Sequence, residues 1–148
     1  MPLSFNSVRF GALEIDPEEV IEFPLGLIGL GGSRYALIDR NPGSGFFWLH
    51  ELEDPALALP VVRPERFFSN FSLQITPEDR QRTGLRDLSG ARVYATVRTA
   101  PNPREITANL RAPIVVIDGH GYQVINTSEP APLKAPLFTL HPEPAVAS

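Results

Sequence analysis

The densest group of side chains able to do chemistry is a short acidic cluster that follows a histidine. Glu51, Glu53 and Asp54 come directly after His50, at the end of a stretch of apolar residues. Carboxylates held together can act as general acid and base, or they can solvate the end of a strand. Solvation of the strand end is the simpler interpretation. If the cluster has a function, we interpret it as a contact surface for a basic partner, because no second catalytic group is apparent nearby in sequence. An enzyme or ligand-binding protein that uses the cluster and His50 around a pocket is the alternative.

Other reactive groups do not form recognisable constellations. The three histidines, His50, His120 and His141, lie in different segments and lack the spacing of metal-binding pairs on a helix. The chain contains no cysteine, which excludes disulfides, thiolate nucleophiles and the usual structural zinc sites. No serine stands in a Gly-x-Ser-x-Gly elbow, and the phosphate-binding glycine patterns are absent. We therefore expect no catalytic residue, no metal and no cofactor, and a protein that is not an enzyme.

The overall charge argues against a polyanionic partner. With 13 Lys and Arg against 17 Asp and Glu, the formal net charge is −4, so no diffuse positive field can hold a nucleic acid. Local RNA binding through Arg92, Arg98 and Arg111 is the remaining possibility of that kind. The first residues lack a signal-peptide pattern, and the longest apolar stretch, 112–117, is far shorter than a membrane helix. We expect a cytoplasmic protein, monomeric when free, that binds neither membrane nor nucleic acid directly.

The elements that must position these groups are short strands. The 16 prolines and 11 glycines divide the 148 residues into short segments, a pattern typical of a single all-β domain. Within 46–52, alternation sends at least one of Phe46, Phe47 and Trp48 outward, and that ring is a candidate interface. We predict a mainly β, single-domain, antiparallel β-barrel-like fold with one or two short helices. The predicted strands are 3–10, 12–15, 20–23, 35–39, 46–52, 57–63, 91–99, 110–117 and 122–126.

Turns and helix ends have clear residue signals. Asn41–Gly45 and Asp118–Gly121 combine Asn, Asp, Pro and Gly and predict chain reversals. Thr76, followed by proline and two acids, predicts the start of a helix that Gly84 ends. Pro60 lies inside a predicted strand, which is expected only at an edge, a bulge or a strand start.

A proline-rich segment follows the last predicted strand. Residues 129–148 contain five prolines and no glycine, a composition that cannot pair in a sheet interior and tends to run extended along a surface. We therefore divide the chain into a β-barrel-like domain, 1–127, and a C-terminal tail, 128–148, that is extended or partly disordered.

Three stretches together resemble one protein family, the bacterial flagellar assembly factor FliW. Residues 23–29, FPLGLIG, are similar to that family's Phe-Pro-x-Gly-Ile-x-Gly loop. Residues 47–58 run from Phe-Trp-Leu to Glu-Asp-Pro and an alanine, similar to its aromatic strand and Asp-Pro turn. Residues 106–115, ITANLRAPIV, are close to its Thr-Ala-Asn-Leu-x-Ala-Pro-Ile signature. The order and spacing agree over about residues 5–126.

The resemblance implies a function in flagellum biogenesis and translation regulation. A protein of that family binds newly made flagellin in the cytosol as a chaperone. When flagellin is exported, it binds the translational regulator CsrA instead and antagonises it without occupying the RNA site, by an allosteric or electrostatic mechanism. The resemblance thus implies that the chain works by exchanging two protein partners.

Two sets of candidate residues follow. For partner contact we nominate the acidic Glu51, Glu53 and Asp54, and the loop from Asn102 to Arg104, as exposed and oriented positions. Each motif residue also has a structural explanation, since glycines permit the loop, an asparagine can bond nearby backbone and a proline sets where a strand pairs. The motif residues that mark either the fold or an interface are Pro24, Gly26, Gly29, Trp48, Thr107, Asn109 and Pro113.

Overall fold

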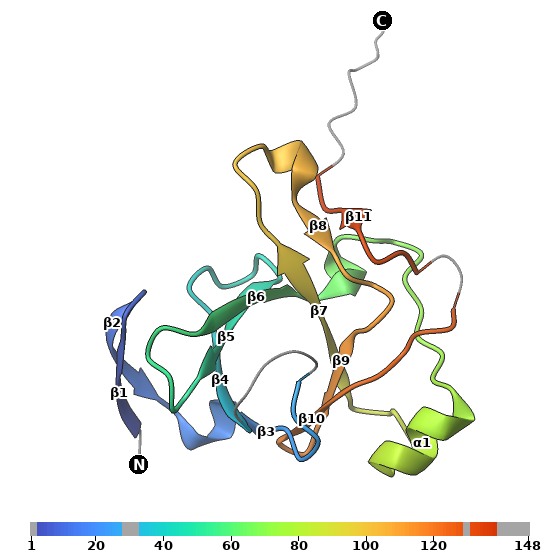
Figure 1. Ribbon diagram of the computed structural model, residues 1–148, viewed down its shortest axis with the longest axis horizontal. Helices are drawn as coiled ribbons and strands as arrows, with labels where there is room; N and C mark the ends of the chain where they lie inside the picture. Colours follow the sequence, from blue (N-terminus) through green and yellow to red (C-terminus); the bar gives the residue numbers. More distant parts are fainter. Residues whose placement is uncertain (1–2, 28–32, 129–130, 139–148) are drawn as a thin grey trace, which may run out of the picture.

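A computed structural model describes residues 3–27, 33–128 and 131–138 of the chain, which form a β-barrel with a hairpin beside it (Figure 1). The elements include one α-helix and three short 3-10 helices, labelled η, among these residues. In chain order they are β1 (Leu3–Ser7), β2 (Gly11–Ile15), η1 (Pro17–Glu19), β3 (Val20–Glu22), β4 (Arg34–Ile38), β5 (Phe46–Glu51), β6 (Ala58–Val62), η2 (Pro64–Arg66), α1 (Pro77–Thr83), β7 (Arg92–Arg98), η3 (Pro103–Glu105), β8 (Thr107–Ala108), β9 (Ile114–Ile117), β10 (His120–Gln123) and β11 (Ala135–Pro136).

Seven strands close the barrel in the order β7-β6-β5-β4-β3-β10-β9, and β9 pairs back to β7. Neighbouring strands are antiparallel except for β3 and β10, which are parallel where His120 lies opposite Glu22. The hairpin of β1 and β2 is a separate two-stranded sheet, and β8 and β11 extend the barrel sheet outward from β7. The predicted mainly β, antiparallel barrel-like fold with short helices is therefore confirmed.

The predicted helix signals act as expected, whereas the turn predicted over 118–121 is shorter, because His120 and Gly121 belong to β10. The Thr76 hydroxyl accepts a hydrogen bond from the Asp79 backbone N–H at 3.0 Å, and Gly84 ends α1 with a φ of +78°. Asp118 and Gly119 both have positive φ, 51° and 76°, as the tight turn between β9 and β10 requires. Pro60 pairs with Trp48 of β5 but lies before the residues of β6 that pair with β7. Its missing N–H therefore costs no bond to β7.

Two predicted strands exceed the observed ones by three residues or more. The strand predicted over 3–10 ends at Ser7 because Ser7 Oγ accepts from the backbone N–H groups of Arg9 and Phe10 and turns the chain. The strand predicted over 110–117 begins only at Ile114. Before it, Asn109 Oδ1 accepts from two backbone N–H groups, which holds a turn instead.

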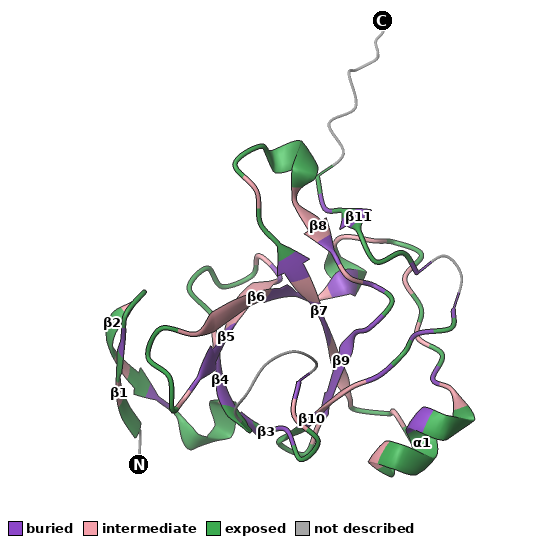
Figure 2. Ribbon diagram, in the orientation of Figure 1, coloured by how far each residue is buried: buried purple, intermediate pink, exposed green. Residues whose placement is uncertain are grey.

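Buried residues follow the strands of the barrel (Figure 2). They form three apolar clusters on the two sides of the barrel wall. One fills the interior with Phe23, Tyr35, Tyr94 and their neighbours. The second lies outside β6 and β7, beneath the phenylalanines of residues 67–71. The third packs Val115 of β9 against the segment around α1. Because β7 and β9 are covered on both faces, their sequences are apolar at consecutive positions.

The described part of the proline-rich segment packs on the second cluster. Ala135 and Pro136 form β11, which pairs with Ala108 and Thr107 of β8. Ala131, Ala135 and Leu137 are buried. Residues 135–136 thus add to the sheet edge, with bends at 133–134 and 137. The domain boundary at residue 127 and the extended or partly disordered tail stay predictions.

Candidate functional site

The N-terminal hairpin of β1 and β2 packs on the outer face of β5. Along β5, Phe47 and Leu49 join the interior cluster, so alternation points Trp48 and His50 outward. Trp48 meets the Phe10 ring edge-on at a centroid distance of 5.6 Å, and the Arg9 guanidinium lies 4.5 Å from the Trp48 ring centroid. The outward aromatic ring predicted as an interface is therefore covered by the hairpin of the same chain.

His50 and Ser7 join the hairpin to the barrel through a buried hydrogen bond. Both side chains are buried, His50 completely, and Ser7 Oγ lies 2.7 Å from His50 Nε2. His50 Nδ1 lies 3.0 Å from the Glu51 carbonyl oxygen, which can only accept, so Nδ1 carries a proton. The Phe5 ring contacts the imidazole edge-on at 4.9 Å.

A serine hydroxyl on an imidazole nitrogen is also the geometry of a nucleophile and its base. Here Phe5 and Phe10 stand against the ring, and the two residues are buried. None of the four pockets described among residues 3–27, 33–128 and 131–138 has His50 or Ser7 in its lining. The contacts of His50 thus serve to hold the hairpin, and they do not favour the enzyme alternative.

The Ser7→Ala substitution is expected to loosen the hairpin while leaving the barrel folded. It removes the partner of His50 Nε2 and the acceptor for two backbone N–H groups, a loss of about 1–3 kcal/mol. Amide hydrogen exchange should accelerate in β1 and β2 and stay unchanged in β5. Ser4→Ala, on the exposed face of β1, is the matched control. Equal protection of the hairpin in both variants would refute this role of Ser7.

The acidic cluster is not uniformly exposed. Glu51 is 6% exposed and lies opposite Tyr35 of β4, so its predicted place on an exposed contact surface is wrong. Burial raises the pKa of the Tyr35 phenol, and the Glu51 carboxylate raises that pKa further. Glu51 Oε1 accepts from the Glu53 backbone N–H at 2.6 Å. The buried Glu51 side chain therefore stabilises the turn that follows β5 through this hydrogen bond.

Glu53 and Asp54 are exposed at the tip of that turn, which lies beside the hairpin (Figure 1). Asp54 Oδ1 accepts from the Ala56 backbone N–H at 3.0 Å, and the Val8 N–H donates to the Pro55 carbonyl at 2.8 Å. These bonds fix the direction in which the two carboxylates project. We refer to Glu53 and Asp54 as the acidic pair.

The second nominated loop lies elsewhere on the barrel. Asn102 and Arg104 are exposed. Asn102 directly precedes η3 and Arg104 lies within it, between β7 and β8 (Figure 1). Asn102 Oδ1 accepts from the Arg104 backbone N–H at 3.0 Å, so Asn102 caps η3. The structure does not bring this loop together with the acidic pair, and its role in binding stays a prediction.

The motif residues occupy turns and strand starts. The Gly26 N–H donates to the Phe23 carbonyl at 3.0 Å, which closes a turn with Pro24 inside it. Gly29 lies outside the described residues. Thr107 pairs with Arg98 and Pro136 in the extension of the sheet. Pro113 is buried, and its carbonyl accepts from the Val124 N–H at 3.1 Å.

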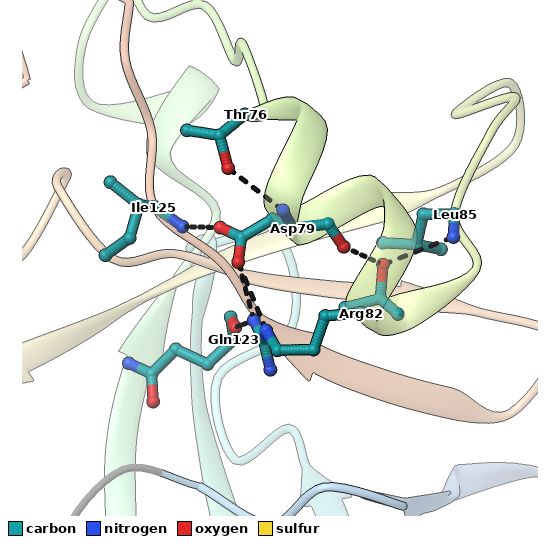
Figure 3. Close-up of polar contacts among 7 residues, drawn as sticks. Thr76, Asp79, Arg82, Leu85, Gln123 and Ile125 are labelled. Atoms are coloured by element: carbon teal, nitrogen blue, oxygen red, sulfur yellow. Dashed lines mark hydrogen bonds and ion pairs between the residues drawn. The ribbon is translucent and has the colours of Figure 1, made fainter.

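Sequence reasoning missed one ionic contact, which attaches α1 to the barrel (Figure 3). Asp79 Oδ2 accepts from the Ile125 backbone N–H at 2.7 Å, and Oδ1 accepts from Arg82 Nη2 at 2.9 Å. Arg82 Nη2 also donates to the Gln123 carbonyl. The sequence pattern explains Asp79 as an acid near a helix N-terminus. No local pattern predicts its hydrogen bond to the Ile125 backbone, 46 positions later.

The arginines considered for RNA contact do not act together. Arg92 stands 5.9 Å from the Tyr94 ring centroid, and Arg111 Nε donates to the Ala131 carbonyl at 3.0 Å. Burial raises the pKa of the Tyr94 phenol, and the guanidiniums of Arg92 and Arg63 partly offset that rise. Arg98 is exposed on the β8 side of the sheet. Within the described residues, these side chains lie in separate contacts and offer little support for an RNA surface.

The comparisons with known proteins agree with both the fold and the sequence motifs. The profile of a family described as "FliW protein" matches residues 4–137, which is most of the chain. The chain belongs to the FliW family. A flagellar assembly factor FliW from Alkaliphilus metalliredigens is 37% identical over 110 residues, which cover 73% of this chain and 68% of that relative. One from Leptospira biflexa is 32% identical over 134 residues and 87% of both chains.

A solved structure supports the fold of this FliW chain. The crystal structure of a flagellar assembly factor FliW matches it with a TM-score of 0.78 and 23% identity, over 93% of this chain and 99% of that one. The FliW relatives carry the name of an assembly factor and not of an enzyme. Over the described ranges of this FliW chain, no helix has the length and apolar character to cross a membrane, and no three acidic or histidine side chains gather as metal ligands.

Proposed function

We propose that this FliW family member binds flagellin in the cytosol and, when free of it, binds and antagonises the translational regulator CsrA. The regulator is held by a non-competitive route in which the acidic pair stands near the path of the messenger RNA. No bond is made or broken in this cycle. The cycle is controlled by flagellin and CsrA, which compete for the same chain.

The acidic pair is the observation that carries the proposal. Glu53 and Asp54 are exposed, and the turn that presents them is fixed by Glu51 Oε1 and by the Pro55 carbonyl. The formal net charge of the whole chain is also negative, −4, so it does not oppose the negative potential of the acidic pair. Two carboxylates on a rigid turn can pair with basic residues of a partner, and they repel RNA phosphates that approach the same surface.

The experiment is charge reversal of the acidic pair in the full chain. The double variant Glu53→Lys with Asp54→Lys is expected to weaken CsrA binding about tenfold, measured by isothermal titration, with the loss largest at low salt. The binding of CsrA to its messenger RNA should also be less inhibited by this variant than by the wild-type chain.

The control is a double variant with the same change in net charge on another surface. Glu78 and Asp87 are exposed in and after α1, so Glu78→Lys with Asp87→Lys should bind CsrA as the wild type does. Equal affinity for all three chains would show that the acidic pair is not the contact. Wild-type chain that binds neither flagellin nor CsrA at micromolar concentration would remove the proposed function itself.

A further inference from the structure

A groove runs between the hairpin and the end of the barrel strand β4. It has a volume of about 290 Å³ and is lined by residues 13–16 of the hairpin side, by Glu19 of η1 and by residues 37–40. A second pocket, of about 380 Å³, shares Glu19, Leu37 and Asp39 with it. The rest of that pocket is lined by Phe47, Arg63, Arg92 and Tyr94. The two hollows are therefore continuous around these shared residues, and we call the first of them the hairpin groove.

The hairpin groove borders a free strand edge. Three consecutive residues of β2, 13–15, line it together with Asp16, which follows the strand, although neighbouring side chains of a strand point to opposite faces. Consecutive residues can share a pocket only along the edge of the strand. Within the described residues β2 pairs with β1 alone, so the edge that faces the groove has unpaired backbone groups. An extended segment can add to such an edge as a further strand.

The side chains around this edge have a charge pattern and an apolar floor. The lining has four exposed carboxylates without an ion-pair partner among the described residues: Glu14, Asp16, Glu19 and Asp39. Its one cation, Arg40, lies 5.2 Å from the Phe10 ring centroid. Leu37 is buried below them and Leu13 is half-buried. No three of these carboxylates converge on a point as metal ligands do. A string of separated carboxylates over an apolar floor complements a chain with spaced positive charges.

We propose that the hairpin groove binds an extended segment of a partner protein in which basic and apolar side chains alternate. The segment adds to the free edge of β2 through its backbone. Its apolar side chains face Leu13 and Leu37, and its basic side chains meet Glu14 and Asp16. This surface is distinct from the acidic pair, so it stands whether or not the proposed function does.

The test uses the full chain and a synthetic peptide in which arginine and leucine alternate, labelled with a fluorophore. Fluorescence anisotropy is expected to show saturable binding below about millimolar concentration, at least about tenfold tighter than for the peptide with glutamate in place of arginine. The double variant Glu14→Lys with Asp16→Lys should weaken binding about tenfold. Asp16 makes no side-chain cap bond to η1, so this change leaves the fold intact.

Two controls separate the groove from general attraction to an acidic protein. The Glu78→Lys with Asp87→Lys chain has the same net charge as the groove variant, and the Glu53→Lys with Asp54→Lys chain lacks the acidic pair. Both should bind the peptide as the wild type does. Equal loss in all three double variants would overturn the assignment to the hairpin groove, as would the absence of saturable binding to the wild-type chain.

Backbone methylation of the peptide tests the strand addition itself. In an added strand, alternate residues donate to the neighbouring edge, so N-methylation at one alternating set of positions should weaken binding about tenfold or more, while the other set has little effect. If both methylated sets bind as tightly as the parent peptide, the contact is electrostatic only and the proposal is wrong.

Discussion

The Asn126→Ala variant is expected to lose about 4 kcal/mol of its free energy of unfolding, because each orphaned buried partner costs about 1–3 kcal/mol. The Asn126 side chain is 2% exposed and holds three segments together. Its Oδ1 accepts from the backbone N–H groups of Gln74 and Ser128, both at 3.0 Å. Its Nδ2 donates to the carbonyls of Ser72 at 3.0 Å and Leu110 at 3.2 Å. Such a loss is a large part of the roughly 5–15 kcal/mol that stabilises a domain.

Urea unfolding followed by the fluorescence of Trp48, the single tryptophan, measures this loss. Asn70→Ala removes an exposed asparagine from the same connection and should change stability by no more than about 0.5 kcal/mol. A loss below about 1 kcal/mol in Asn126→Ala would mean that the backbone groups find other partners. The Asn126 side chain would then not be what holds the three segments together.

The Gly121→Ala variant is expected to cost about 2–3 kcal/mol through overpacking of the barrel interior. A Cβ at this position would lie 2.5 Å and 2.8 Å from two ring carbons of Phe23 and 3.0 Å from Ile21 Cγ2. Phe23 is itself 1% exposed and stands edge-on to Tyr35, so its ring has little room to move. The sequence pattern placed Gly121 in a turn, whereas the structure requires it in β10 for the close approach of Phe23.

A double-mutant cycle checks that explanation. Phe23→Leu removes the ring atoms that the new methyl group would meet, so Gly121→Ala should cost much less in that background than in the wild type. The four free energies of unfolding come from denaturant titrations of the single, double and parent chains. If the two losses simply add, the cost does not arise from the contact with Phe23.

The sequence predicted the local parts of this fold because their causes are local. Thr76 and Gly84 bound α1 through contacts within the helix itself. The positive φ of Asp118 and Gly119 is a property of those residue types. Strand alternation also predicts that the Glu51 side chain is buried, and not exposed with the rest of the acidic cluster. Glu51 follows Phe47 and Leu49 at a spacing of two, which places its side chain on the inner face and is consistent with its burial.

The contacts that fix the candidate site join distant segments, and no local pattern reports them. Ser7 and His50 are 43 positions apart, and Asn126 meets residues more than 50 positions earlier. The hairpin groove depends on where β1 and β2 dock, which hydrophobic patterning alone does not determine. The family motifs indicated the chain's relatives. The role of Asn109 was predicted because its bonds are local, whereas the close contact of Phe23 with Gly121 becomes visible only in the folded barrel.

The one parallel pair of the barrel affects how the chain folds during synthesis. β3 meets β10 where Glu22 lies opposite His120, and the Glu22 N–H donates to the Gly119 carbonyl at 2.9 Å. On the ribosome, β3 to β7 therefore emerge as an open sheet whose two outer edges have no partner until β9 and β10 follow. Contacts between such distant positions form slowly. During that interval the nascent sheet is exposed to pairing with other chains, so β9 and β10, which are synthesised late, are the strands that protect the barrel from aggregation.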